Sequence, residues 1–128
     1  MADRIERFVQ AMRVRPSDRV LEIGCGHGVA ASLICAQLDA AGRYVAVDRS
    51  EKMIAAAMKR NQAHVRSGRA AFLVGDFETV DLGTQRFDKV LAMRVRLFFT
   101  DPQRARALVQ RWLAPGGQLF VEYDEPGR

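Results

Sequence analysis

Three glycines alternate with other residues in one short segment, at Gly24, Gly26 and Gly28, and an acidic residue, Glu22, stands two positions before them. Glycine adopts left-handed backbone conformations without penalty, so such a segment can turn tightly and approach a bound molecule closely. If a helix follows, its first N–H groups point at the same molecule. The spacing therefore predicts a ligand-binding loop.

Two aspartates extend this pattern. Asp48 lies 20 residues beyond Gly28 at the end of an apolar segment, and Asp76 follows the next apolar segment. A carboxylate at the tip of the second strand of a parallel sheet can accept hydrogen bonds from both hydroxyls of a ribose. Asp76 would then lie one strand further out, where an adenine ring would rest. Either aspartate alone could instead cap a helix or a turn.

The spacing of the glycines separates two classes of nucleotide-binding loop. The fingerprint of dinucleotide-binding proteins needs a third glycine at the position that Val29 occupies here. That glycine is absent, which argues against a nicotinamide-dependent oxidoreductase. No residue stands out as a general base or a nucleophile, so the catalytic residues stay unassigned.

The elements that must position these residues alternate along the chain. Five mostly apolar segments suit buried parallel strands, at 20–23, 44–47, 71–74, 87–93 and 118–123. Helices are predicted over 5–12, from 29 to near 41–42, from 51 to about 66 with Gly68 as a left-handed cap, and from 102 to about 112. This alternation predicts an α/β fold with a doubly wound, mostly parallel sheet.

Composition narrows the class of protein further. The 128 residues fit one domain, and no apolar segment reaches the roughly 20 residues that cross a membrane. The N-terminus lacks the apolar part of a signal peptide, so a cytoplasmic location is expected. Two cysteines without a metal-binding pattern predict neither a disulfide framework nor a metal site. Seventeen of the 20 basic residues are scattered arginines, so the net charge of +5 does not predict nucleic-acid binding.

Five segments resemble, in order and spacing, the motifs of class I (Rossmann-like) S-adenosylmethionine-dependent methyltransferases. They are Arg19–Gly28, Val45–Asp48, Val74–Phe77, Phe87–Leu91 and Leu113–Leu119. The resemblance covers nearly the whole chain. It implies one S-adenosylmethionine-binding core domain of about five strands in the order 3-2-1-4-5, with S-adenosylhomocysteine as the product of the cofactor.

The resemblance also implies roles for the residues around the glycine loop. The loop would cradle the methionine part of the cofactor, through Gly24, Cys25, Gly26 and Gly28. Glu22 would orient this loop. The carbonyl of Met93, at the end of the fourth strand, would accept a hydrogen bond from the methionine ammonium group.

A second group of residues is implied to hold the adenosine. Asp48 would accept hydrogen bonds from the ribose hydroxyls, and Arg49 would flank the adenine. Within the segment Gly75–Phe77, the carboxylate of Asp76 would accept a hydrogen bond from the exocyclic amine of adenine. The backbone N–H of Phe77 would meet a ring nitrogen.

Two departures from the family bear on the acceptor and on partners. The segment Ala92–Arg96 lacks the Asp/Asn-Pro-Pro-aromatic motif of methyltransferases that act on amino groups of bases and of glutamine, which argues against amino groups of DNA bases as acceptors. This departure does not choose among small molecules, other proteins and RNA; of these, a small-molecule acceptor is expected. The family's sheet normally ends in an antiparallel hairpin, which this sequence is expected to lack. The strand at 118–123 would then present an open edge, through which we expect homo-oligomerisation.

Several functions stay open at this point. The sequence predicts a methyltransferase, but it also fits an S-adenosylmethionine-binding module, or an inactive fragment, that has no acceptor site of its own. An aminopropyltransferase would bind a diamine through acidic residues after the fourth strand, where Arg94 and Arg96 stand instead.

Overall fold

The computed structural model describes residues 3–122, which form one five-stranded sheet. All neighbouring strands are parallel, and their order is β3-β2-β1-β4-β5. The strands are β1 (Arg19–Ile23), β2 (Arg43–Asp48), β3 (Ala70–Val74), β4 (Phe87–Met93) and β5 (Leu113–Glu122). The predicted fold class and strand order are confirmed. From β1 the chain adds β2 and β3 on one side and then β4 and β5 on the other, so the strand order reverses between β1 and β4.

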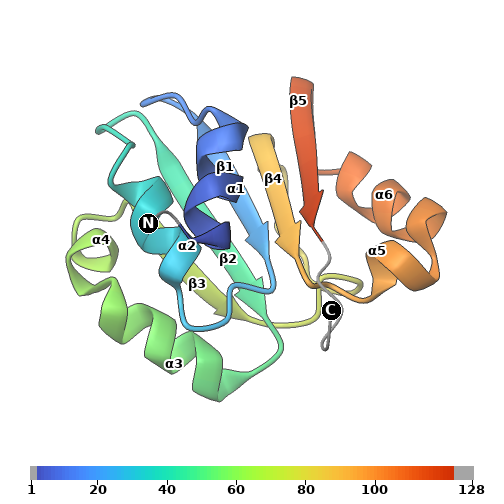
Figure 1. The fold of residues 1–128 in the computed structure, drawn as a ribbon, viewed down its shortest axis with the longest axis horizontal. Coiled ribbons are helices and arrows are strands. Elements are labelled where there is room, and N and C mark those ends of the chain that lie inside the picture. Colours follow the sequence, from blue (N-terminus) through green and yellow to red (C-terminus); the bar gives the residue numbers. More distant parts are fainter. Residues whose placement is uncertain (1–2, 123–128) are drawn as a thin grey trace.

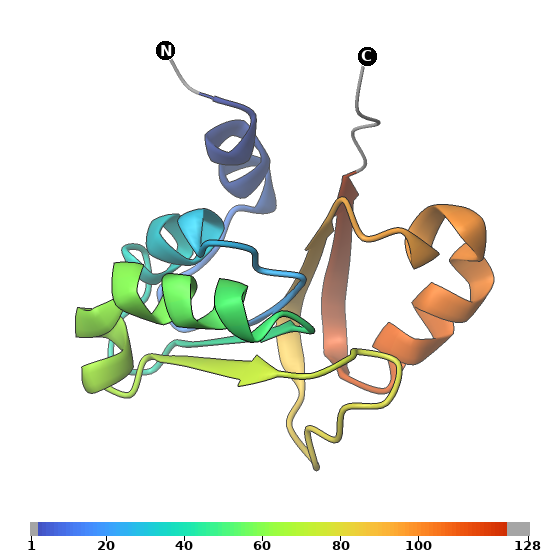
Figure 2. The ribbon, with the colours of Figure 1, turned by 90° about the horizontal axis from the view of Figure 1, so that it is seen from below.

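Within the described residues, six helices cover the two faces of this sheet (Figures 1 and 2). They are α1 (Arg4–Met12), α2 (Val29–Cys35), α3 (Glu51–Arg60), α4 (Gln62–Arg66), α5 (Leu97–Thr100) and α6 (Pro102–Gln110). The first four lie on one face, and α5 and α6 lie on the other. None of the helices within residues 3–122 is long and apolar enough to span a bilayer.

Each face of the sheet buries its own hydrophobic core, because successive side chains of a strand point to opposite faces. In β1, Val20 packs with the cluster under α1–α3, whereas Leu21 and Ile23 pack with the cluster under α5 and α6. Trp112 and Phe87 are among the largest buried side chains of this second cluster.

The predicted helix from 51 to about 66 is interrupted at Asn61, which ends α3 and precedes α4. The amide group of Asn61 is buried; its Nδ2 donates to the carbonyls of Gly28 (3.1 Å) and Ala57 (2.9 Å). Its Oδ1 accepts a hydrogen bond from Ser32 Oγ at 2.8 Å. These bonds fasten α3 to the start of α2. Gly68 adopts the predicted left-handed conformation after α4.

Three further features of the fold differ from the predictions. α2 ends at Cys35 rather than near positions 41–42, and the short α5 was not predicted. Residues 114–117, expected as a turn before the last strand, form a bulge inside β5: Phe87 pairs with Leu113 but Lys89 pairs with Gln118. The predicted end of this strand at Tyr123 lies outside the described residues.

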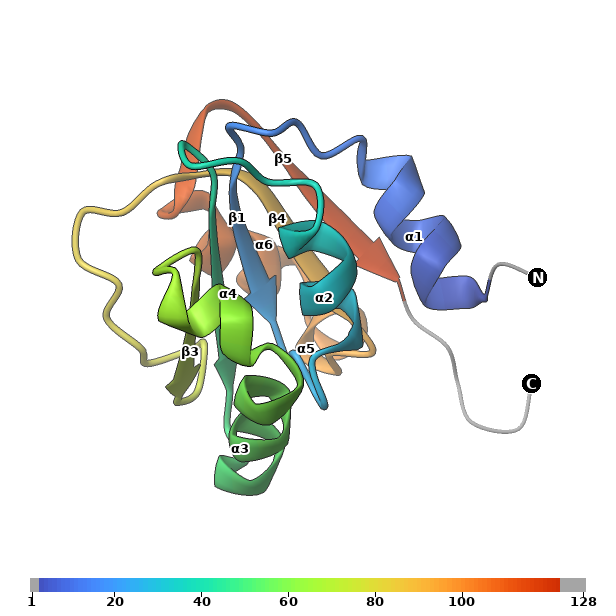
Figure 3. The same cartoon turned by 90° about the vertical axis from the view of Figure 1, so that its left-hand side faces the viewer.

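Among residues 3–122, β5 pairs only with β4, and its outer edge carries no further strand. Its apolar side chains are nevertheless half-buried, Phe120 on the face of α1 and Leu119 on the face of α6. An ion pair between Arg4 Nε and Glu122 Oε2 (3.3 Å) joins α1 to β5, and Figure 3 shows α1 beside the end of this strand. α1 and α6 thus cover the two faces of the sheet at β5 in part.

Candidate functional site

A cavity of about 450 Å³ lies at the carboxyl ends of the strands, on both sides of the point where strand order reverses. Open α/β sheets bind their ligands at this position. Six of the predicted site residues line it: Gly24, Asp48, Arg49, Gly75, Asp76 and Phe77. The other predicted residues are not part of its lining: Glu22, Cys25, Gly26, Gly28 and Met93.

The glycines of the loop serve different purposes. A Cβ atom on Gly28 would lie 2.9 Å from Ala57, so Gly28 is required for the close packing of α2 against α3. At Gly26 (φ +53°) an added Cβ would meet nothing within 4 Å. Gly26 therefore borders open space and leaves room beside the loop. Gly28, in contrast, is required by packing between two helices and not by a ligand.

Asp48 connects the glycine loop to the tip of β2. Its Oδ2 accepts a hydrogen bond from the backbone N–H of Gly26 (3.0 Å), and its Oδ1 accepts one from the N–H of Ser50 (2.9 Å). The side chain of Ser50 in turn caps α3 by accepting from Met53 N–H. Each carboxylate oxygen can accept a second hydrogen bond. Asp48 thus has a structural role in the loop and still has acceptor capacity toward the cavity.

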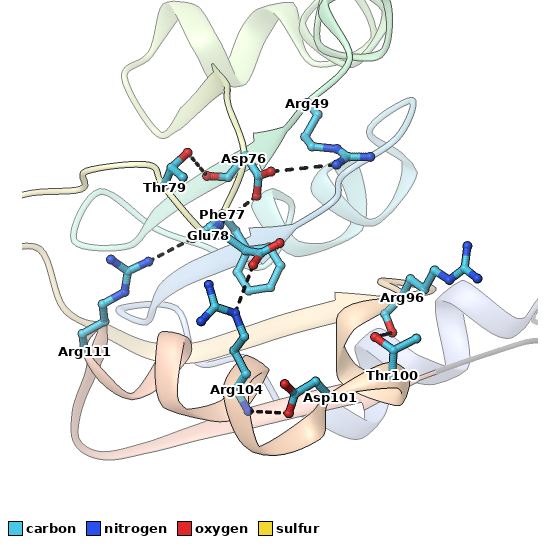
Figure 4. A network of polar contacts seen from close by, with 10 residues as sticks. All are labelled: Arg49, Asp76, Phe77, Glu78, Thr79, Arg96, Thr100, Asp101, Arg104 and Arg111. Carbon is cyan, nitrogen blue, oxygen red and sulfur yellow. Dashed lines mark hydrogen bonds and ion pairs between the residues drawn. The ribbon is translucent and has the colours of Figure 1, made fainter.

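Asp76 holds a turn on the neighbouring strand tip (Figure 4). Its Oδ1 accepts from the N–H of Glu78 at 2.9 Å, and its Oδ2 lies 3.8 Å from Arg49 Nη1. The ring of Phe77 is buried and stacks on Phe98, with ring centroids 5.9 Å apart.

Of the two backbone hydrogen-bonding groups of Phe77, only the carbonyl has a partner within residues 3–122. Its carbonyl accepts a hydrogen bond from Arg111 Nη2 at 2.9 Å. No acceptor for its N–H is found in residues 3–122. A backbone donor at the wall of a cavity is left available for a ligand, since buried or half-buried amides normally have a partner.

Glu22 lies beneath the loop and is only 2% exposed. Its Oε1 accepts a hydrogen bond from the hydroxyl of Tyr44 at 2.6 Å. Burial raises the pKa of this carboxyl to about 7, helped by the negative charge of Asp48 and opposed by the bond from Tyr44. Burial also raises the pKa of the Cys25 thiol to about 12, which excludes a thiolate nucleophile at neutral pH.

Met93 ends β4 opposite Glu122, next to the cavity. The residues that follow it line the cavity and were not predicted as site residues: Arg94, Val95, Arg96, Leu97 and Thr100. Glu78 was missed as well. Their place directly after the carboxyl end of a strand was the available signal, because every such segment of a parallel sheet faces the same edge.

Comparison with protein families shows to which family this domain belongs. A family model described as a methyltransferase domain matches residues 20–117, which include the glycine loop and all five strands up to the bulge of β5. The chain belongs to this methyltransferase family. It is a class I family of enzymes that bind S-adenosylmethionine and S-adenosylhomocysteine.

Individual known proteins are similar to most of this methyltransferase domain. Phosphoethanolamine N-methyltransferase 1 of Arabidopsis thaliana is 28% identical over 116 residues, 91% of this chain and 23% of the relative. The structure of the CcbJ methyltransferase from Streptomyces caelestis is 26% identical, with a TM-score of 0.73, covering 91% of this chain and 47% of that one. The [4+2]-cyclase SpnF is also 26% identical, with a TM-score of 0.75, over 91% and 42%. The chain thus spans less than half the length of each.

The buried carboxyl of Glu22 predicts a pH-dependent stability of the methyltransferase domain. Its pKa is raised from 4.5 to about 7 by folding, so the folded state binds this proton more tightly than the unfolded state. Its contribution to stability is therefore complete below pH 4.5 and is lost as the pH rises through 7, by about 3 kcal/mol. Glu22→Gln keeps the acceptor for Tyr44 and removes the titration.

Urea unfolding of both proteins between pH 4.5 and 8 measures this. We expect Glu22→Gln to gain about 3 kcal/mol relative to the wild type over this interval. The exposed Glu51 supplies the control, since Glu51→Gln should follow the wild-type curve. A difference between Glu22→Gln and wild type that does not vary with pH would contradict the assignment.

Proposed function

We propose that this domain binds S-adenosylmethionine in the cavity and presents its methyl group to a small-molecule acceptor. The observation that carries the proposal is the meeting of Gly24, Asp48 and Asp76, from three adjacent strand tips, around one cavity. Each supplies what one part of the cofactor needs: close backbone approach, a ribose acceptor and an adenine acceptor.

The adenosine would lie over the tips of β2 and β3. Asp48 would accept from the ribose hydroxyls while keeping its bond to Gly26, and Asp76 would accept from the exocyclic amine. The available N–H of Phe77 would donate to a ring nitrogen, and Arg49, already beside Asp76, would flank the adenine. Gly75 would let the backbone of this segment approach the ring.

The methionine part would then extend across the glycine loop toward the tips of β1 and β4. Gly24 lines this part of the cavity, and Gly26 borders the open space beside it. The carbonyl of Met93 would accept from the ammonium group. Glu22 would support the loop from below, together with Cys25 and Gly28 inside it.

The cofactor supplies a methyl group on a positively charged sulfur, which is a good leaving group. The residues of the chain would then align the two reactants and exclude water from the site. Holding two reactants in line is itself a large part of catalysis. We assign no general base: His27 is exposed on the loop and does not line the cavity, and the thiol of Cys25 stays protonated.

A second candidate function is a cofactor-binding module whose acceptor site, or whose reaction, depends on parts beyond this domain. Two observations favour keeping it: the chain spans under half the length of its relatives, and one relative of the same fold is named a [4+2]-cyclase. The two candidates share the cofactor and differ in whether the domain alone transfers a methyl group.

Calorimetric titration with S-adenosylmethionine, S-adenosylhomocysteine and NAD tests the proposal. We expect the first two to bind and NAD not to bind, because the loop lacks the third glycine of the dinucleotide fingerprint. Binding of NAD without S-adenosylmethionine would overturn it.

Asp48→Ala should weaken cofactor binding by about 1–3 kcal/mol, the cost of losing hydrogen bonds to a charged group. The same calorimetric titration measures it. Because Asp48 also holds Gly26 N–H, thermal unfolding must show that the variant is folded at the temperature of the titration. Asp81→Ala, an exposed aspartate outside this cavity, is the control. Wild-type affinity in Asp48→Ala would exclude the ribose role.

Gly26→Val should abolish cofactor binding, because the added side chain would fill the open space beside the loop. Its left-handed backbone also penalises any β-branched residue. Gly68 has the same kind of conformation (φ +79°) and open surroundings, but it lies after α4, away from the cavity. Gly68→Val should therefore lose similar stability and keep the affinity. Equal affinity of both variants would show that the loop does not face the cofactor.

Self-association through the outer edge of β5 stays a prediction, as does a cytoplasmic location. Exposed strand edges pair readily with another chain, and a two-fold dimer is the simplest closed arrangement. Light scattering over a concentration series should show a species of twice the 14.3 kDa mass of the chain. A single mass of 14.3 kDa at all concentrations would contradict it.

A further inference from the structure

The charged side chains around the cavity are not evenly compensated. On the side of β2 and β3 each carboxylate has a partner: Asp76 faces Arg49 at 3.8 Å, and Glu78 Oε1 lies 3.2 Å from Arg104 Nε. Asp48 accepts two backbone hydrogen bonds. Asp76 and Glu78 are therefore compensated before any ligand binds, and Asp48 leaves this side of the cavity with about one net negative charge.

The opposite wall, after β4, is cationic. Arg96 lines the cavity there and is exposed, and the described residues of this wall that line the cavity include no acidic one. The guanidinium group of Arg96 has no hydrogen-bond or ion-pair partner within residues 3–122. In Figure 4 it extends away from Asp76 and Glu78. The charge of Arg96 is therefore not paired with Asp76 or Glu78 on the adenosine side of the site.

The proposed position of the cofactor determines which molecule lies against the wall after β4. With adenosine over β2 and β3, the reactive sulfur lies toward β1 and β4, so the segment from Arg94 to Thr100 faces the space beyond the methyl group. Val95 and Leu97 add apolar surface there, and Thr100 adds a hydroxyl. The acceptor must occupy this space for an in-line transfer.

We infer that the acceptor carries a carboxylate or phosphate group, which binds to Arg96. This inference rests on the proposed function. The cofactor brings a sulfonium, an ammonium and a carboxylate, a net positive charge, next to a wall that is already cationic. An anionic acceptor offsets this charge, whereas an acceptor with a cationic group would be repelled. Guanidinium groups bind carboxylate and phosphate through paired, charge-assisted hydrogen bonds.

Nuclear magnetic resonance on the ¹⁵N-labelled domain saturated with S-adenosylhomocysteine tests this. Inorganic phosphate and acetate are titrated separately, with sodium chloride at equal ionic strength as the reference. We expect saturable shifts of the amides of residues 94–100 with at least one of the two anions and not with chloride; the better of the two identifies the anionic group.

Arg96→Gln should weaken that anion at least about tenfold, the loss expected when a charge-assisted pair is removed. The affinity for S-adenosylhomocysteine, measured by calorimetry, should change less than about twofold. Arg106→Gln, which removes an exposed arginine of α6 outside the cavity, is the matched control and should change neither.

Three results would overturn the inference. Shifts no larger than those with chloride, or equal behaviour of the two variants, would leave Arg96 without a ligand. Weaker S-adenosylhomocysteine binding in Arg96→Gln would mean that the arginine holds the carboxylate of the cofactor instead. If S-adenosylhomocysteine does not bind even to the wild type, the proposed function fails and the inference fails with it.

Discussion

The carboxylate of Asp48 joins the parts on which the site depends. One oxygen holds the N–H of Gly26 and the other the N–H of Ser50, so the glycine loop after β1 and the start of α3 after β2 are fixed by the same side chain. Asn61 completes this arrangement from the other end of α3 by bonding to the carbonyl of Gly28. The loop is therefore held in shape by its neighbours, and a preorganised loop pays less conformational entropy when a ligand binds.

The residues of the site come together because the parallel sheet places the carboxyl ends of all strands at one edge. That consequence of topology is what made the sequence informative. Three apolar segments of strand length, each followed by or ending in a glycine or aspartate, predicted that Gly24, Asp48 and Asp76 lie at one cavity, whereas the strand order was implied by the resemblance to class I methyltransferases. The two aspartates are also caps, as the alternative interpretation held. Both roles fit one carboxylate, since it accepts up to about four hydrogen bonds.

What the sequence did not predict depends on contacts between distant residues. The break at Asn61 is set by bonds to Ser32 and Gly28, which no local pattern encodes. The helix α5 has four residues and no periodicity, and the bulge of β5 is visible only against the register of β4. For the same reason Arg94 and Arg96 were noted only as an argument against a diamine and not as residues of the cavity wall.

The central claim is that adenosine lies over β2 and β3, held by Asp48 and the N–H of Phe77. A crystal structure of the domain with S-adenosylhomocysteine tests it most directly. The account predicts ribose hydroxyls within about 3 Å of the Asp48 carboxylate and an adenine nitrogen within about 3 Å of Phe77 N. It also predicts that the bond from Gly26 N–H to Asp48 is retained. An adenosine bound elsewhere, or an Asp48 turned away from the ribose, would contradict it.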